Sequence, residues 1–326
     1  MKTAPWPGRR AGNGPLRTLA LATLVSNIAI VVTGGAVRLT GSGLGCPTWP
    51  RCTQRSFVPH GELGMHGAIE FGNRMMTFVL AAIAIATWVA AVRARPRRRS
   101  VRVLATVLAL GIPGQALIGG VTVLTDLNPW VVSLHLMLSM AMVALAVLLV
   151  REVGQGGPLV VPRVHAALRR LTVAIMGATF VVLYLGTVVT GAGPHAGHLQ
   201  PTDLEGNRVL VVRNGLDAQV VSHVHAASVY LLVGLTLVAL LVASRTGAPR
   251  DVRRAALTLL AVEAAQATVG FTQYFLDLPI LLVGIHLLGA ALLTAAATWL
   301  LVSTRRATDP QSAPHRDAGS SQAVPS

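Results

Sequence analysis

The sequence predicts an all-α membrane protein with eight transmembrane helices, arranged as two pseudo-repeated four-helix bundles. Three observations predict this fold class. First, 53% of the 326 residues are hydrophobic and only 12% are charged, with a mean hydropathy of +0.62. A soluble domain of this length could not bury so much apolar surface. Second, eight apolar runs approach or exceed the roughly 20 residues that a spanning helix needs. Third, parts of the first half recur in the second, which indicates one unit present twice.

The eight apolar runs are expected to cross the membrane one after another. They cover about 19–37, 66–92, 103–124, 130–150, 171–189, 220–243, 255–275 and 278–302. The first run is full length and lacks a small-residue cleavage site before a soluble domain, so we expect no cleaved signal peptide.

The basic residues predict the orientation of these spans. Of the 27 basic residues, 21 lie in the N-terminus, the C-terminal tail and the loops on the same side, whereas five lie on the opposite side. The positive-inside rule then places both termini in the cytoplasm, in a multi-pass protein of the cell (plasma) membrane. The net charge of +15 is therefore a topology signal. We expect no nucleic-acid partner, because the basic runs directly adjoin the helix ends.

The spans and loops divide the chain into five segments. These are a cytoplasmic N-terminus (1–15), an N-terminal four-helix half (16–150), a cytoplasmic linker (151–170), a C-terminal four-helix half (171–302) and a disordered cytoplasmic tail (303–326). The linker is rich in glycine and the tail in serine, proline and alanine, which is typical of connecting and disordered segments.

The internal repeat is clearest around His135 and His286. Matching residues recur with a constant offset of 151, namely Gln115, Gly119, Asp126 and Leu127 as Gln266, Gly270, Asp277 and Leu278. A second match, of 31–34 with 188–191, has an offset of 157. A histidine at an equivalent place in each half of an apolar protein suggests two related metal or haem sites.

Three histidines lie at a similar depth in the expected helices. His135, His225 and His286 are five to seven residues from the outer end of their runs, which is roughly 8–10 Å below the outer surface. Polar side chains at this depth usually face the bundle interior, and hydrogen bonding between helices is the alternative to ligation. His225 and His286 belong to one half and are expected to bind one haem iron from opposite faces. His223 is about 200° around the helix from His225, so both cannot face one iron.

The second expected helix contains the candidates for a second ligand opposite His135 in the N-terminal half. An offset of 152 aligns Asn73 with His225, close to the 151 that relates the two repeated histidines. An offset of 157 instead aligns His66 with His223, and this alternative stays open.

Two charged residues, Glu70 and Arg74, accompany Asn73 on the same helix. They are four residues apart, so one interpretation is a pair that satisfies itself. The other is a functional site, in which Arg74 meets a haem propionate. Glu263, in the seventh run, has no counterpart in the first half and no assignment.

Both cysteines, Cys46 and Cys52, lie in the first outer loop. The outer face is oxidising, which favours a disulfide bond over a metal pair that lacks a third ligand nearby. A pair that cycles between thiol and disulfide is a further alternative, because an exposed bond in a short loop is reducible.

The chain resembles the haem A synthase family, whose members make haem A from haem O. The resemblance covers 16–302 and rests on four features: the motif from Thr33 to Pro47, the motif Glu70-Phe71-Gly72-Asn73-Arg74, the motif from Thr190 to His195, and the two repeated histidine helices. It implies an oxidoreductase that oxidises a haem methyl group to a formyl through two successive hydroxylations and loss of water.

The resemblance also implies what each half binds. The C-terminal half would hold a permanent haem b, with its iron, on His225 and His286. The N-terminal half would bind the substrate haem O through His135 and the motif on the second helix. Glu70 matches the family's catalytic glutamate. The Cys46–Cys52 pair matches a loop pair found in many bacterial members.

One position departs from the family motif. The motif on the second helix usually reads Glu-x-x-His-Arg, and Asn73 stands in place of the histidine. A carboxamide is a poor haem ligand, so the substrate iron keeps His135 alone or gains His66 as a substitute. His66 lies two turns away, about 10.5 Å along the helix axis, and serves only if the haem lies nearer the surface or the helix is shifted.

The expected partners are haem O and the enzyme that makes it, membrane lipid, the assembly machinery of a terminal oxidase, an unidentified electron acceptor and a second copy of this chain. Two other functions stay open. One is a di-haem membrane carrier that oxidises quinol, and the other is a haem-handling scaffold for a terminal oxidase. Only the enzyme would convert haem O into haem A in a host that lacks haem A.

Overall fold

The computed structural model describes residues 14–155, 158–193 and 213–307. Eight of the helices in this part of the chain are long and apolar enough to cross a membrane. They are α1 (Gly14–Leu39), α2 (Gly64–Arg93), α3 (Arg99–Leu124), α4 (Pro129–Gln155), α5 (Ala166–Ala192), α6 (Ala218–Arg245), α7 (Arg250–Phe275) and α8 (Ile280–Ser303). The short elements are η1 (Gly61–Leu63), β1 (Leu159–Pro162) and β2 (Arg305–Ala307). The expectation of an all-α protein with eight spans is confirmed.

The helices extend beyond the apolar runs because polar residues begin and end them. Asp217 caps α6 by accepting a hydrogen bond from the N–H of Val220 at 2.8 Å. At the opposite end of the bundle, Arg93 and Arg245 close α2 and α6, where long basic side chains keep their charge in water while their stems cover apolar surface.

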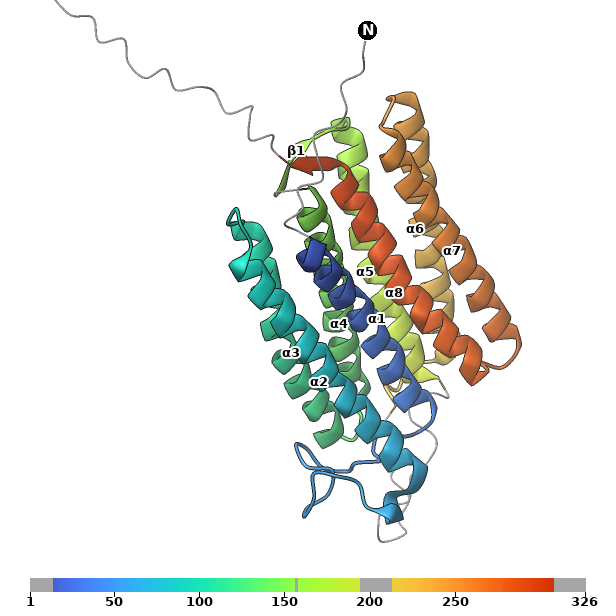
Figure 1. Cartoon of the computed structure of the whole chain (residues 1–326). Coiled ribbons are helices and arrows are strands. Elements are labelled where there is room, and N and C mark those ends of the chain that lie inside the picture. Colours follow the sequence, from blue (N-terminus) through green and yellow to red (C-terminus); the bar gives the residue numbers. More distant parts are fainter. Residues whose placement is uncertain (1–13, 156–157, 194–212, 308–326) are drawn as a thin grey trace, which may run out of the picture.

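The helices form two groups of four that lie side by side (Figure 1). In one group, α1 packs on α2, α2 on α3, α3 on α4, and α4 returns to α1. In the other, α5, α6, α7 and α8 close a ring in the same order. The groups meet where α8 contacts α1 and α4, and where α4 contacts α5. In this arrangement α2 faces α4, and α6 faces α8, diagonally across the interior of a group.

A small core cluster marks the contact between the two groups. Its buried members are Val31, Met140, Leu183 and Ala291, from α1, α4, α5 and α8. Val31 and Leu183 are 152 residues apart, and Met140 and Ala291 are 151 residues apart. Equivalent residues of the two groups therefore meet in this cluster. The same offsets of 152 and 151 relate Asn73 to His225 and His135 to His286.

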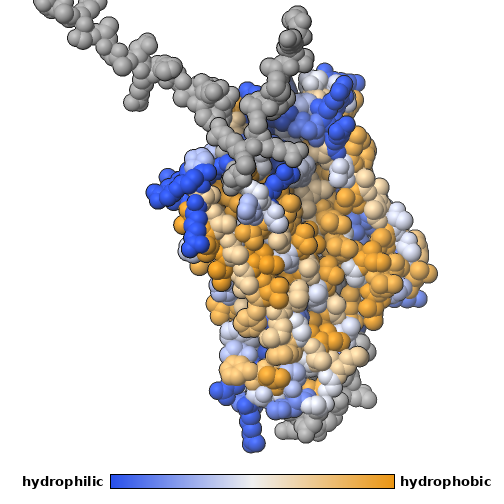
Figure 2. Space-filling model, in the orientation of Figure 1, coloured by the Kyte–Doolittle hydropathy of each residue, from blue (hydrophilic) through white to orange (hydrophobic). Residues whose placement is uncertain are grey.

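Apolar side chains cover the outside of the bundle. Every long helix exposes some of them, for example Val25, Phe78, Leu110, Leu134, Val173, Leu231, Leu257 and Leu281. On the face shown in Figure 2, a wide apolar band lies between two more hydrophilic ends. Because water would not tolerate so large an apolar patch, lipid covers it, and the chain is a multi-pass membrane protein.

The turns between α3 and α4 and between α7 and α8 have the same unusual backbone. Asp126 and Leu127 have φ values of 49° and 57°, and Asp277 and Leu278 have 56° and 58°. This left-handed conformation is uncommon for residues other than glycine. Equivalent hydrogen bonds close both turns, from the N–H of Leu127 to Thr122 O and from that of Leu278 to Gln273 O, each 2.8 Å long.

The segment between the two groups pairs with the end of the last helix. β1 and β2 are antiparallel, with Leu159 opposite Ala307 and Pro162 opposite Arg305. The segment 303–326 was expected to be a disordered tail, but its first residues finish α8 and form β2, because the strand is hydrogen bonded and Leu159 is buried beside it. Residues 1–13 and 308–326 lie outside the described part of the chain.

Candidate functional site

Three histidines share one structural setting. Each lies against a glycine of the preceding helix. Its ring atom Cε1 is next to the position that a Cβ atom would occupy on that glycine. A Cβ at Gly119 would lie 3.4 Å from Cε1 of His135, and a Cβ at Gly270 would lie 3.3 Å from Cε1 of His286.

His225 repeats this arrangement between α5 and α6. A Cβ at Gly186 would lie 3.3 Å from its Cε1. The distances at Gly186 and Gly270 are slightly shorter than ordinary van der Waals contact and that at Gly119 is at its lower limit, so a glycine lets the flat ring lie directly against the neighbouring helix without displacement.

The fourth pair of consecutive helices, α1 and α2, carries Asn73 in the corresponding place. A Cβ at Gly34 would lie 3.9 Å from the Nδ2 of Asn73. Gly34 and Gly186 are 152 residues apart, as are Asn73 and His225. The contacts therefore align Asn73 with His225, and not His66 with His223. In addition, Thr33 donates a hydrogen bond from Oγ1 to Asn73 Oδ1 at 2.8 Å.

Each of the three half-buried histidines has a buried ring nitrogen, Nδ1. In the described part of the chain, the Nδ1 atoms of His135 and His286 are buried and make no hydrogen bond, whereas the ring of His225 interacts with the backbone of Val182 on α5. Leaving a buried polar atom unsatisfied costs about 1–3 kcal/mol. His225 and His286, on the diagonal helices α6 and α8, are also close enough to interact electrostatically.

These observations fit a haem held by imidazoles. Neutral imidazole is a common axial ligand of haem iron, and within the described ranges none of these three rings is hydrogen bonded to another side chain. No group of three or more His, Cys, Asp or Glu side chains that could hold a bare metal ion occurs in the described ranges. Haem needs only one or two protein ligands, so the donor set suits haem better than a protein-ligated ion.

The remaining histidines of the helices are placed differently. His223 is exposed on the outside of α6. His66, in the first turn of α2, shares a 2.9 Å hydrogen bond through Nδ1 with Ser42 Oγ, which in turn contacts Thr40 Oγ1 at 2.8 Å. His66 is thus bound into the outer loop.

A glutamine supports the backbone of each repeated histidine. Gln266 donates from Nε2 to the carbonyl oxygen of His286 at 3.0 Å, and Gln115 donates to that of His135 at 3.4 Å. Gln115 also donates to Ser139 at 2.8 Å. These contacts fix the height of each histidine relative to the preceding helix.

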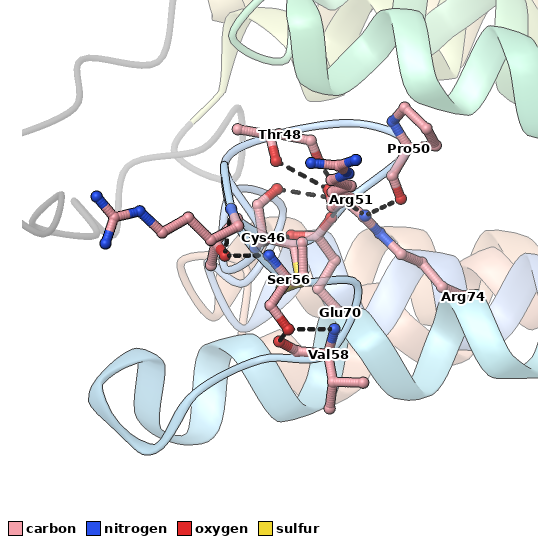
Figure 3. The surroundings of a disulfide bond; sticks show 11 residues. Cys46, Thr48, Pro50, Arg51, Ser56, Val58, Glu70 and Arg74 are labelled. Atoms are coloured by element: carbon pink, nitrogen blue, oxygen red, sulfur yellow. Dashed lines mark hydrogen bonds and ion pairs between the residues drawn. A yellow bond between two sulfur atoms is a disulfide. The ribbon is translucent and has the colours of Figure 1, made fainter.

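Glu70 lies buried beneath the loop between α1 and α2, with only 5% of its surface exposed. Its Oε1 accepts a 2.6 Å hydrogen bond from Arg74 Nη2, and its Oε2 accepts a 2.7 Å hydrogen bond from the backbone N–H of Cys46 (Figure 3). Glu70 and Arg74 therefore form an ion pair one helical turn apart.

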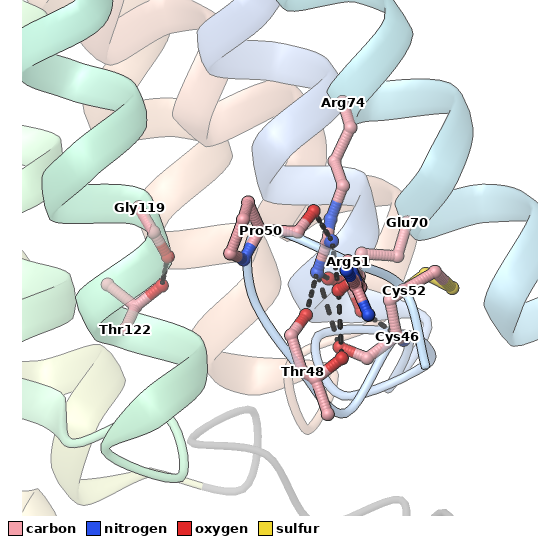
Figure 4. A network of polar contacts seen from close by, with 9 residues as sticks. All are labelled: Cys46, Thr48, Pro50, Arg51, Cys52, Glu70, Arg74, Gly119 and Thr122. Atoms are coloured by element: carbon pink, nitrogen blue, oxygen red, sulfur yellow. Dashed lines mark hydrogen bonds and ion pairs between the residues drawn. A yellow bond between two sulfur atoms is a disulfide. The ribbon is translucent and has the colours of Figure 1, made fainter. Parts of the chain in front are cut away.

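Arg74 connects α2 to that loop. Beyond Glu70, its guanidinium donates to the carbonyl oxygens of Cys46, Thr48, Pro50 and Arg51 at 3.1–3.5 Å (Figure 4). A planar guanidinium with five N–H donors suits this set of acceptors. The donors of Arg74 are thus directed to the loop and to Glu70.

The cysteines form the disulfide bond Cys46–Cys52, which is confirmed. An exposed bond was assumed for a pair that cycles, but both cysteines are fully buried. The loop is also fixed against α2, since a Cβ at Gly45 would overlap the backbone carbonyl of His66.

The other side of the loop rests on α3. The indole of Trp49 lies so close to Gly120 that a Cβ there would overlap the ring. Figure 4 shows Pro50 beside the Arg74 network, facing the part of α3 that carries Gly119. The loop thus spans one end of the N-terminal group, from α2 with Asn73 to α3, whose Gly119 lies against His135.

Glu263 lies in the C-terminal group, two turns below Gly270 on α7. It is 2% exposed, and its Oε1 accepts a 2.8 Å hydrogen bond from Thr236 Oγ1 of α6. Its Oε2 is buried without a hydrogen-bond partner among the described residues.

Sequence reasoning missed several residues that shape these sites. Gly119 and Gly270 recurred in the repeat but received no function, and Gly186 and Gly34 went unnoticed. Each of these glycines lies at the same level as a polar residue of the next helix. This relation can be recognised only when it is known how the two helices pack together. The motif that begins at Thr190 is described as far as Gly193, and the rest lies outside the described residues.

Comparison with known proteins connects the chain to haem biosynthesis. The model of the family described as "Cytochrome oxidase assembly protein" matches residues 17–67 and 62–298. The chain is 31% identical over 185 residues to "Heme A synthase" of Bacillus pumilus (strain SAFR-032), a match covering 53% of this chain and 58% of that protein. It is 28% identical over 265 residues to "Heme A synthase" of Symbiobacterium thermophilum, covering 78% of this chain and 84% of that protein.

A third relative gives the same picture. "Heme A synthase" of Lysinibacillus sphaericus (strain C3-41) is 30% identical over 181 residues, covering 54% of this chain and 58% of that protein. The match thus spans little more than half the length of the first two curated relatives, and most of the Symbiobacterium protein.

Proposed function

Because the chain belongs to the cytochrome oxidase assembly protein family, together with curated haem A synthases, we propose that it oxidises the methyl group of haem O to the formyl group of haem A by successive hydroxylations. One observation carries this proposal. Both groups of helices place a histidine, His135 or His286, against a glycine at matching positions, and within the described residues the buried glutamate bonded to a loop is Glu70 of the N-terminal group. The two groups are therefore built for different tasks.

In this proposal the C-terminal group holds a permanent haem b. His225 and His286 would bind its iron from the diagonal helices α6 and α8, and their mutual electrostatic interaction supports this pairing. Two imidazole ligands leave no open coordination position, and such a haem supplies electron transfer. Gly186 and Gly270 set the ring positions by admitting no side chain.

The N-terminal group would bind the substrate haem through His135. The loop that carries Cys46 and Trp49 covers the outer end of this group and keeps bulk water away from Glu70. Glu70 takes or relays a proton during the reaction, and Arg74 together with the N–H of Cys46 holds its two oxygens in place. The iron–porphyrin system supplies the redox chemistry, and the protein positions it.

The proposal includes the surroundings of the enzyme. Both termini lie in the cytoplasm of a plasma-membrane protein, because the basic loops are found at one end of the spans. The matching contacts of Asn73 and His225, and of the two left-handed turns, support a repeat of one four-helix unit. The enzyme that makes haem O would precede this protein, and oxidase assembly would follow it.

The test is conversion of haem O in a host that supplies haem O but makes no haem A. We expect the unmodified protein to yield haem A, and Glu70→Gln to accumulate haem O while retaining haem b. Glu152→Gln is the matched control, because Glu152 is also buried (6% exposed) but lies near the opposite end of the bundle.

Three results would contradict the proposal. Unchanged haem A output from Glu70→Gln would remove Glu70 from the reaction. Bound haem without any conversion would favour the quinol-oxidising carrier. A purified protein without haem that still supports oxidase assembly would favour the scaffold.

A further inference from the structure

The two groups of helices differ at one ligand position. Three of the four consecutive helix pairs set a histidine against a glycine, and the pair α1–α2 sets Asn73 against Gly34. On α4, His135 lies against Gly119 in the same way that His286 on α8 lies against Gly270. The N-terminal group therefore keeps one imidazole of the pair, His135, and lacks the other.

Asn73 cannot replace that imidazole as a ligand. Its Oδ1 accepts the 2.8 Å hydrogen bond from Thr33, which turns the carbonyl toward α1. The nitrogen of a neutral carboxamide is a donor without a free lone pair. In the C-terminal group the residue equivalent to Thr33 is Leu185, which has no hydroxyl, so the hydrogen bond belongs to the asparagine site alone.

His66 does not fill the gap either. Its Nδ1 is bonded to Ser42, and the adjoining backbone carbonyl lies directly against Gly45 of the loop. It is seven residues, about 10.5 Å, from Asn73 along α2. To reach the level of Asn73, the ring of His66 would have to break its hydrogen bond with Ser42, and Gly45 would have to separate from the backbone of α2.

We propose that haem iron bound to His135 is five-coordinate in this protein, with an open sixth position on the side of Asn73 that takes a small neutral diatomic ligand. The Nδ2 group of Asn73, held by Thr33, donates a hydrogen bond to that ligand. This inference rests on the proposed binding of haem in the N-terminal half. The haem in the C-terminal half, with two imidazoles, takes no such ligand.

Carbon monoxide is the probe, because it binds ferrous haem only where a coordination position is open. The whole protein is purified from a host that makes haem O, its haems are extracted and counted, and the reduced protein is titrated with CO. We expect one CO for each protein molecule and a high-spin ferric signal from the same haem. Both should disappear in His135→Ala, which loses the N-terminal haem.

Two variants of the key residue make the test specific. Asn73→His should keep both haems, abolish CO binding and convert the high-spin signal to low spin. Asn73→Leu should keep CO binding but raise the C–O stretching frequency, because the amide donor is gone. Thr33→Val, which frees the amide, should raise the same frequency by a smaller amount.

The outcomes separate this inference from the proposed function. Two low-spin haems that do not bind CO would overturn the inference alone, and CO binding that appears only in His66→Ala would identify His66 as the sixth ligand. A CO signal that persists unchanged in His135→Ala comes from adventitious haem and also overturns it. A protein that never holds haem in its N-terminal half would overturn both proposals.

Discussion

The backbone N–H of Cys46 donates a 2.7 Å hydrogen bond to the carboxylate of Glu70. This bond joins the disulfide-closed loop to the one buried carboxylate near the outer end of the N-terminal group within the described residues. The position of Glu70 therefore depends on the conformation of a loop that contains none of the proposed haem ligands. Four predictions follow from this contact and from the other close contacts of the bundle.

Gly45→Ala should disturb Glu70 without touching it. The new Cβ would overlap the carbonyl of His66 and approach the N of Gly67 to 2.8 Å, and backbone atoms within a helix cannot give way. The loop should shift, at a cost of about 1–3 kcal/mol, and withdraw the N–H of Cys46. We expect haem O conversion to fall at least about tenfold, with haem b content unchanged.

Gly61→Ala is the control for this prediction, because a Cβ there meets nothing within 4 Å. Extracted haems measured for both variants decide the matter. Equal activity of the two variants would show that the loop does not position Glu70.

Arg74→Lys should loosen the loop while preserving the charge. An ammonium has three donors and cannot reach Glu70 and four carbonyl oxygens together, so we expect a loss of about 1–3 kcal/mol in local stability. Trypsin should then cut faster after the exposed Arg51, whose carbonyl Arg74 holds. Arg55→Lys, at another exposed loop position, should leave that rate unchanged. A rate unaffected by Arg74→Lys would show that the guanidinium network is dispensable.

Gly186→Val should displace the imidazole of His225. The Cβ would already lie 3.3 Å from Cε1, and the two methyl groups have no room beside the ring. Haem b per protein, measured from the reduced spectrum, should fall well below the wild-type level. Gly177→Val, also on α5, should retain haem b, because nothing lies within 4 Å of a Cβ there. Full haem b content in Gly186→Val would argue against His225 as a ligand.

Thr236→Val should destabilise the C-terminal group. It removes the donor to Glu263 and leaves both oxygens of a buried carboxyl without partners, which costs about 1–3 kcal/mol of unfolding free energy. The double variant Thr236→Val/Glu263→Leu should recover most of this loss, because both polar partners are removed together. Thermal unfolding checks the prediction, with Thr179→Val as a control that only loses a bond to its own helix at Ile175. No recovery in the double variant would indicate that the Glu263 carboxyl is needed for another reason.

Much of the fold could be predicted because the membrane imposes simple rules. Composition and run length identify all eight spans, and the repeat around His135 and His286 includes the two Asp–Leu pairs, although their left-handed backbone is visible only in the structure. Helix ends were misplaced by a few residues, since arginine and capping residues extend the helices past the apolar runs.

The relation between neighbouring helices could not be predicted. The sequence alone left offsets of 152 and 157 open for α2, and the contacts of Gly34 with Asn73 and of Gly186 with His225 favour 152. Which residue of one helix faces which residue of the next depends on helix rotation and crossing, which one-dimensional periodicity does not record. For the same reason the acceptors of Arg74, which are loop carbonyls, gave no signal in the sequence.

The pairing of β1 with β2 has a practical consequence for labelling this protein. Arg163 reinforces it, donating from its backbone N–H to Thr304 and pairing with Asp251 through two hydrogen bonds of 2.8 and 2.9 Å. A fluorescent tag inserted directly after α8 would remove β2 from its pairing with β1, and the segment between the two halves would lose this contact with the end of α8. A tag attached after Ala307 preserves the pairing of β1 with β2, so this position is the safer one for a fusion.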